Sequence, residues 1–208
     1  MNTRSSSVVL LIVALCALVG FAQPVTVTDQ AGVTLSLEVP VQRLISVYGI
    51  GTYYVYALGA GDQLAVAYYV GLRSAADAPA TMLRWEPRLP EILSFGDPNV
   101  EALLATEPDL ILADAGRHRS FAETMNGLGV PVVLCSAETP DAMMEAIHLT
   151  ASLLGEAAQA KARAFEADHT RVTAAVSDHL DAISAVSYTH LRAHETVLDL
   201  VCRLLLEK

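Results

Sequence analysis

The sequence predicts an α/β lobe with a parallel sheet and flanking helices, preceded by a β-hairpin and followed by a long helix. Three observations lead to this fold class. Short apolar runs alternate with helical segments between residues 43 and 154, as in parallel strands joined by helices. Alternating polar and apolar residues surround a glycine-containing turn near residue 31. Residues 156–180 are rich in alanine and charge, which is typical of a long solvated helix.

The first half of the chain supplies the hairpin and two strands. Its predicted elements are a hairpin of residues 25–29 and 33–38, a strand at 43–47, a helix at 52–58 and a strand at 64–68. Pro40 ends the hairpin and Gly59 closes the helix. A connection that contains glycine, alanine and proline follows, to about residue 90.

The second half is more regular. Its predicted elements are helices at 99–105, 120–128, 140–154 and 156–180, and strands at 109–113 and 130–135. Pro98 opens the first of these helices. Thr139 is expected to cap the helix of residues 140–154, and Gly155 to end it.

Composition and charge narrow the function. The chain has 208 residues, of which 53% are hydrophobic, so it can bury a core. Its 23 acidic residues outnumber the 13 basic ones, which argues against a nucleic-acid partner, since nucleic acid selects basic surfaces.

The N-terminus predicts export. Arg4 precedes an unbroken apolar run, and the small residues Gly20 and Ala22 stand where a signal peptidase reads its substrate. We therefore expect residues 1–22 to be a cleavable signal peptide and the mature protein to be periplasmic. A lipoprotein anchored through Cys16 is the alternative, but Leu15 occupies a position where a lipoprotein signal requires a small residue.

The last segment, residues 185–208, is expected not to be native protein. Residues 187–196 (SYTHLRAHET) match the translation of a transposase sequencing adapter, and 199–208 match a flow-cell adapter in the same frame. We therefore exclude the segment from the fold prediction, including its zinc-like spacing of His190 and His194. We expect the natural chain to continue beyond Ser184.

Four ordered segments give the chain a resemblance to a known family. They are residues 27–32 (VTDQAG), 43–47 with 56–62 (RLISV, YALGAGD), 98–104 with 107–111 (PNVEALL, EPDLI) and 128–133 (LGVPVV). In order and spacing they resemble the substrate-binding proteins of ABC importers for iron-siderophores, haem and cobalamin. The resemblance implies two α/β lobes joined by a long helix, with the ligand between them. Residues 23–154 would form the N-terminal lobe and 155–184 the interlobe helix, and the second lobe would be missing.

Ligand contacts in such a fold come from loops at the carboxyl ends of the strands. The ligand-binding residues expected on this basis are Tyr48, Thr52, Tyr69, Phe95, Arg117 and His118. By resemblance to the cobalamin-binding member, Tyr69 and Phe95 stand where aromatic side chains contact ligand. The basic cluster of residues 117–119 favours an anionic ligand such as a ferric siderophore, because arginine offers paired donors to oxygen anions.

Each of these residues has a simpler interpretation. Residues 117–119 could be a solvated helix start, and His118 a polar loop residue. At least some of the tyrosines at 53, 54 and 56 are expected in the core. The resemblance also implies that Glu101 docks the lobe onto arginines of the permease. The alternative is a first-turn glutamate favoured by the helix dipole.

The sequence therefore predicts a binding protein, not an enzyme, that delivers an iron complex, haem or cobalamin to an ABC permease. No cofactor is expected. The alternatives are a zinc, manganese or oxoanion binder of a related class, or a receptor-linked sensor lobe. Only His118 qualifies as a metal ligand in the strand-end loops, and the sequence contains no Gly-x-Ser-x-Gly element of a hydrolase.

Overall fold

The structure is a computed structural model that describes residues 23–69, 71–72 and 74–180. The strands are β1 (Gln23–Thr28), β2 (Thr34–Val39), β3 (Leu44–Ser46), β4 (Leu64–Ala67), β5 (Leu110–Asp114) and β6 (Val132–Cys135). The α-helices are α2 (Gly49–Ala57), α3 (Ala80–Trp85), α4 (Leu89–Ile92), α5 (Val100–Leu104), α6 (Arg119–Gly127), α7 (Pro140–Leu154) and α8 (Glu156–Leu180). The predicted signal peptide and the adapter-like segment lie outside the described residues.

A four-stranded parallel sheet forms the centre of the lobe. Its strand order is β4-β3-β5-β6, and every neighbouring pair is parallel. The central strands are buried on both faces, as their near-continuous apolar sequences require. This sheet, the hairpin and the long final helix confirm the predicted fold class.

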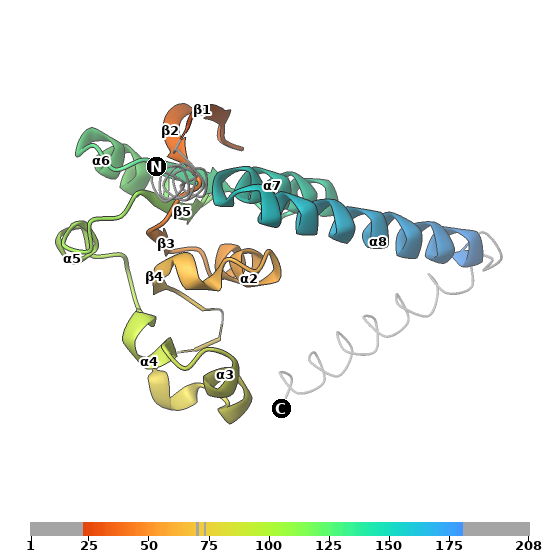
Figure 1. The fold of residues 1–208 in the computed structure, drawn as a ribbon, viewed down its shortest axis with the longest axis horizontal. Coiled ribbons are helices and arrows are strands. Elements are labelled where there is room, and N and C mark those ends of the chain that lie inside the picture. Colours follow the sequence, from red (N-terminus) through yellow and green to blue (C-terminus); the bar gives the residue numbers. More distant parts are fainter. Residues whose placement is uncertain (1–22, 70, 73, 181–208) are drawn as a thin grey trace, which may run out of the picture. The chain divides into compact units, whose positions relative to one another are not determined.

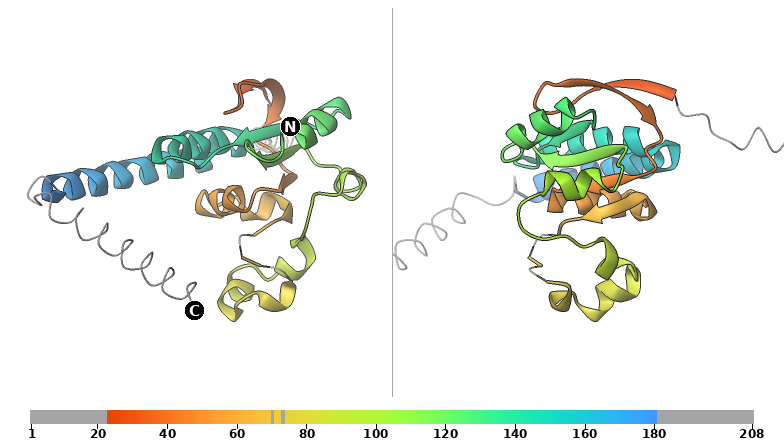
Figure 2. Two further views of the ribbon diagram at one scale, coloured as in Figure 1. Left: turned by 180° about the vertical axis from the view of Figure 1, so that it is seen from behind. Right: turned by 90° about the vertical axis from the view of Figure 1, so that its left-hand side faces the viewer.

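Helices cover both faces of the sheet (Figures 1 and 2). On one face, α2 and α7 pack in a single buried cluster with side chains from all four strands of the sheet. The first turns of α8 add Ala158 and Ala162 to the same cluster. On the other face, Leu103 of α5 and Met125 of α6 pack against Ile111 of β5. The two clusters divide the alternating side chains of each strand between two cores.

The hairpin is tied to the sheet by its turn. Strands β1 and β2 are antiparallel, and Asp29 between them is only 5% exposed. One carboxylate oxygen of Asp29 accepts hydrogen bonds from the N–H groups of Ala31 and Val33, at 2.9 and 2.8 Å. The other accepts from the N–H of Leu134 in β6, at 3.1 Å. The Asp29 side chain therefore closes the turn and, together with hydrogen bonds of Gln30 to Leu134 and Ser136, docks it on the sheet.

Element ends mostly follow the sequence signals. The hydroxyl of Thr139 accepts a hydrogen bond from the N–H of Ala142 and caps α7, as predicted. Gly155 ends this helix with a φ of 107°, which a side chain would disfavour. Helix α2 begins at Gly49, three residues before the predicted start. The segment between β4 and α5 contains the short helices α3 and α4, which the sequence analysis did not predict.

The chain divides into two compact units, residues 1–163 and 164–208. The sheet, the hairpin and α2 to α7 all belong to the first unit. In the described part of the second unit, the side chains of Phe165, Val172 and Val176 are exposed. No helix between residues 23 and 180 is long and apolar enough to cross a membrane.

Candidate functional site

The strand order creates a switch point in the sheet. The chain passes from β3 to β4 on one side and then returns to β5 on the other side of β3. The loops after β3 and β5 therefore diverge at the carboxyl edge of the sheet, and ligands of open α/β sheets bind in the crevice formed there. Tyr48 follows β3, and residues 115–118 follow β5, so the predicted residues Tyr48, Arg117 and His118 flank this switch point.

Two cavities open at this edge and share part of their walls. Their volumes are about 670 and 450 Å³. Both are lined by Val47, Gly49, Arg117 and His118. The larger also contacts Tyr48, Ile50, Asp114, Gly116, Ala137 and Glu138, and the smaller contacts Tyr68, Tyr69, Gly96, Asp97 and Pro98. The loops after all four strands of the sheet thus converge on Arg117 and His118.

The loop that presents Arg117 is held by its own hydrogen bonds. One carboxylate oxygen of Asp114 accepts from the N–H groups of Gly116 and Arg117, both at 2.8 Å. The side chain of Arg117 is exposed. The turn therefore fixes the backbone and leaves a guanidinium at the junction of the two cavities, where it can bind an anion.

His118 is held as a neutral imidazole. Its Nδ1 accepts a hydrogen bond from the N–H of Asp114 at 3.1 Å, so the proton of the neutral ring is on Nε2. Burial lowers the pKa of His118. The charge of Asp114 raises this pKa, the charge of Arg117 lowers it further, and the charge of Asp97 raises it, but the net shift is downward. The side chain therefore offers the cavities a hydrogen-bond donor without a full charge.

We expect the lobe to lose stability in acid through His118. Because the folded-state pKa is lowered, the contribution of this residue is complete above about pH 6.5 and is lost as pH falls through the lowered value. Protonation of Nδ1 removes the acceptor of the Asp114 N–H. The unfolding free energy of the native chain should therefore fall more between about pH 7.5 and 5 than that of His118→Gln, measured by urea denaturation. Parallel pH curves for the two proteins would contradict the assignment.

The other residues predicted to bind ligand differ in how deeply they are buried. Thr52 is fully buried, and its hydroxyl donates to the carbonyl of Tyr68 at 2.7 Å, so it supports the loop after β4 from behind. Tyr48 is also mostly buried, and burial raises the pKa of its hydroxyl. Phe95 is 38% exposed, and its neighbours Gly96 and Asp97 line the smaller cavity.

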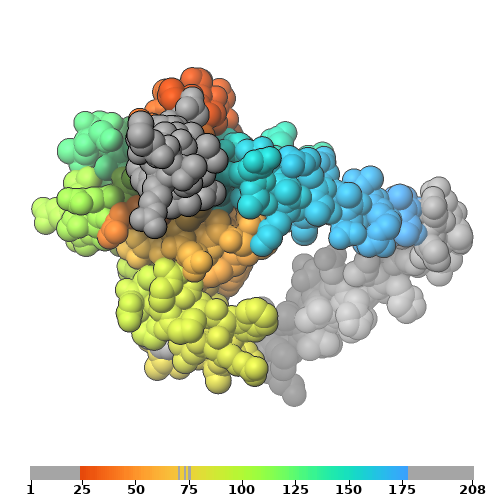
Figure 3. Space-filling model, in the orientation of Figure 1, coloured from red at the N-terminus to blue at the C-terminus, as the bar shows by residue number. Residues whose placement is uncertain are grey.

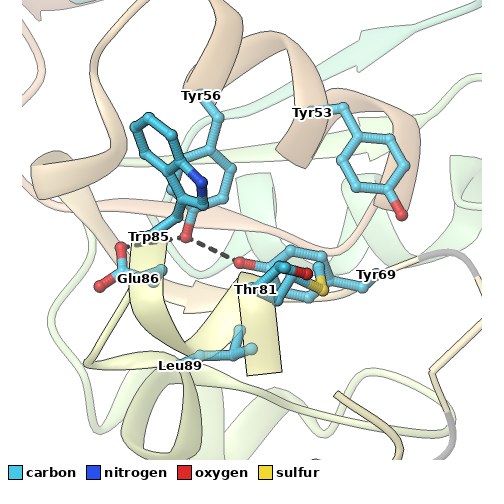
Figure 4. A pocket seen from close by; sticks show the side chains of 8 residues that line it. Tyr53, Tyr56, Tyr69, Thr81, Trp85, Glu86 and Leu89 are labelled. Carbon is cyan, nitrogen blue, oxygen red and sulfur yellow. Dashed lines mark hydrogen bonds between the residues drawn. The ribbon is translucent and has the colours of Figure 1, made fainter. Parts of the chain in front are cut away.

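A third cavity, of about 530 Å³, also contacts Tyr69 (Figure 4). It is lined by Tyr53, Tyr56, Tyr69, Thr81, Met82, Trp85, Glu86 and Leu89. The sequence analysis assigned no function to Trp85 or Glu86 and weighed the tyrosines of residues 53–56 mainly as core. The core prediction is correct for Tyr54, which is 7% exposed. The cluster of tyrosines in this helix was the available signal for the cavity.

Metal binding by side chains has little support in this part of the chain. Across residues 23–180, apart from 70 and 73, no group of three or more His, Cys, Asp or Glu side chains could hold a metal ion.

Glu101 lies in the first turn of α5, which Asn99 caps by accepting from the N–H of Ala102 at 2.9 Å. Its side chain is exposed, as both interpretations of this residue require.

Known structures share this fold. One is a periplasmic solute-binding protein from Veillonella parvula, with a TM-score of 0.65 and 20% identity, covering 75% of this chain and 48% of its own. Another is the iron uptake ABC transporter substrate-binding protein PiuA from Streptococcus pneumoniae, with a TM-score of 0.61, 21% identity and coverage of 79% and 56%. The molybdate-bound periplasmic binding protein MolA from Haemophilus influenzae has a TM-score of 0.64, 18% identity and coverage of 77% and 55%.

These similarities define the class of fold: an α/β lobe of the kind found in periplasmic solute-binding proteins. The sequence model of the periplasmic binding protein family matches residues 44–191, and the chain belongs to this family. Its members are binding proteins and not enzymes, in agreement with the sequence analysis. The chain spans about half the length of these solved proteins. No curated protein matches it.

Proposed function

We propose that this chain provides the N-terminal ligand-binding lobe of an ABC importer's periplasmic substrate-binding protein. The proposed cargo is an anionic complex such as a ferric siderophore. The observation that carries the proposal is the convergence of two cavities on Arg117 and His118 at the switch point of the sheet. A guanidinium and a neutral imidazole donor suit a ligand that presents several oxygen acceptors.

The cargo class follows from charge and from the shape of the walls. Tyr69 lies beside the basic loop and adds flat apolar area. PiuA is an iron uptake protein and MolA a molybdate-binding protein, so proteins with this fold include both iron-uptake and oxoanion-binding members. The combined cavities are larger than a small oxoanion needs, which favours a bulky complex over molybdate. Cobalamin and haem remain alternative cargoes of the proposed site.

Calorimetric titration tests the cargo class. Ferric siderophores of the hydroxamate and catecholate types, haem, cobalamin, molybdate and zinc chloride would each be titrated into the full-length protein. We expect heat of binding with at least one ferric siderophore, without chemical change of the complex. Binding of zinc or molybdate alone would overturn the proposed cargo, and turnover of any ligand would overturn the binding function itself.

We also propose that Glu101 contacts the permease. Its exposed carboxylate at the start of α5 lines none of the three cavities described above. Glu101→Ala should therefore leave ligand affinity unchanged and lower uptake, measured as accumulation of labelled ligand by cells that express the importer. Glu123→Ala, which removes an exposed carboxylate from α6, is the matched control. Reduced affinity with normal uptake would reverse this assignment.

A further inference from the structure

The third cavity is an aromatic pocket that the proposed cargo site does not explain. Tyr53 and Tyr56 come from α2, Tyr69 follows β4, and Trp85 ends α3 (Figure 4). The ring centroids of Tyr53 and Tyr56 lie 6.1 and 6.2 Å from that of Tyr69. The segment containing α3 and α4 lies next to α2 (Figure 3), α4 contacts β4, and a hydrogen bond joins Glu86 to Tyr56 of α2. Trp85, the last residue of α3, lines the pocket with the tyrosines.

The hydroxyl groups in this pocket have a fixed direction of hydrogen bonding. Glu86 is a carboxylate, because hydrogen bonds from Arg88 and Tyr56 outweigh the effect of burial and lower its pKa. A carboxylate only accepts, so Tyr56 donates its single proton to Glu86, at 3.1 Å. Tyr69 must then donate its proton to Tyr56, at 2.7 Å. Burial raises the pKa of both tyrosines, so both keep their protons at neutral pH.

Within this chain of hydrogen bonds, no donor is left for a ligand. Each oxygen of the Glu86 carboxylate already accepts two hydrogen bonds, from Arg88 and Tyr56, so the free lone pairs belong to Tyr69 and Tyr56. The guanidinium of Arg88 donates two hydrogen bonds to Glu86, at 2.8 and 3.1 Å, and one to the carbonyl of Gly61, at 2.8 Å, and the backbone N–H of Arg88 donates a further one to Glu86, at 3.1 Å. Its donors are thus directed to the protein itself, whereas the Glu86 carboxylate lines the pocket.

We infer that the aromatic pocket binds an alkylammonium group. The ring faces attract a cation, and the acceptors receive its N–H donors. Met82 and Leu89 provide apolar contact for the attached methylene chain. The group could belong to a free amine or to an arm of the cargo, since Tyr69 borders both this pocket and the smaller strand-edge cavity. Only the second of these sources, an arm of the cargo, depends on the proposed function.

Trp85 provides the measurement, because it is the only tryptophan of the chain and is 89% exposed. We would titrate the full chain with n-pentylammonium chloride at neutral pH and follow tryptophan fluorescence. 1-Pentanol is the control, since it has the same alkyl chain without the charge. We expect a saturable change with n-pentylammonium and at least ~10-fold weaker binding of 1-pentanol. Equal affinities, or no binding of n-pentylammonium, would overturn the inference.

Variants distinguish the contribution of the Glu86 carboxylate to binding from that of the apolar walls of the pocket. Glu86→Gln removes the negative charge that lines the pocket, so it should weaken n-pentylammonium binding by about 10-fold and leave 1-pentanol unaffected. Glu91→Gln removes an exposed carboxylate from the adjacent helix α4 and should change neither. Tyr69→Phe keeps the Glu86–Arg88 pair intact while it removes one acceptor, so it decides the matter if Glu86→Gln fails to fold. Native affinity in Tyr69→Phe together with native affinity in a folded Glu86→Gln would overturn the inference.

A pair of complexes distinguishes the two sources of the ammonium group. A ferric trihydroxamate with a terminal ammonium would be compared with its N-acetylated form, which lacks the charge. If the pocket holds an arm of the cargo, acetylation should weaken binding by about 10-fold, and Glu86→Gln should abolish the difference. Equal binding of the two complexes, with n-pentylammonium still bound, identifies a free amine as the ligand. Failure of every ferric complex would refute the cargo proposal without affecting the n-pentylammonium result.

Discussion

Asp29→Ala is expected to destabilise the lobe by about 3 kcal/mol or more, because several backbone donors lose their acceptor at once. The N–H of Leu134 lies in the buried strand β6 and has the carboxylate of Asp29 as its partner. A buried donor without a partner costs about 1–3 kcal/mol, and the N–H groups of Ala31 and Val33 add to that cost. The midpoint of urea denaturation, followed by circular dichroism, would measure the effect.

Two further variants make the Asp29 test specific. Asp29→Asn keeps the size of the side chain but turns one acceptor into a donor, which then faces an N–H group, so it should not restore stability. Thr28→Ala changes an exposed residue of the same hairpin and should alter the unfolding free energy by less than about 0.5 kcal/mol. Similar losses for Asp29→Ala and Thr28→Ala would show that the carboxylate does not hold the hairpin on the sheet.

The sheet and its helices could be predicted because their signals are local. The apolar runs of β5 and β6 are long enough to be buried on both faces, and α7 begins at a threonine cap and ends at a glycine. The role of Asp29 could not be predicted in the same way. Its sequence indicates only a turn, whereas the contact with Leu134 joins residues 105 positions apart.

Only part of the aromatic pocket could be predicted from local sequence patterns. Helical periodicity places Tyr54, Val55 and Leu58 on the buried face of α2, so Tyr53 and Tyr56, three residues apart, share another face. That arrangement could have been derived from the sequence. The position of Trp85 could not, because it depends on two short helices in a connection rich in alanine and proline. Such helices are too short to form by propensity alone and are held by tertiary contacts.

The predicted ligand-binding residues differ in how far their positions could be predicted from the sequence. Arg117 and His118 follow a strand whose carboxyl end can be read from the sequence, and they meet at the cavities as the topology of the sheet requires. Thr52 was expected at the start of the helix that follows β3, but α2 begins three residues earlier, so Thr52 lies inside the helix and in the core. Its position in the helix, and not its chemistry, directs its hydroxyl to the carbonyl of Tyr68.

Arg117→Ala should weaken binding of a ferric siderophore by about 10- to 100-fold, because a charge-assisted contact contributes about 1.5–3 kcal/mol. The backbone of the loop should not change, since Asp114 accepts from the main-chain N–H of residue 117 and not from its side chain. The loss should therefore appear in ligand affinity without a change in the urea midpoint. Arg163→Ala removes an exposed arginine from α8 and is the matched control. Calorimetry of both variants would decide the role of Arg117: equal affinities would remove it from the proposed site, and a shifted urea midpoint would assign it to the fold instead.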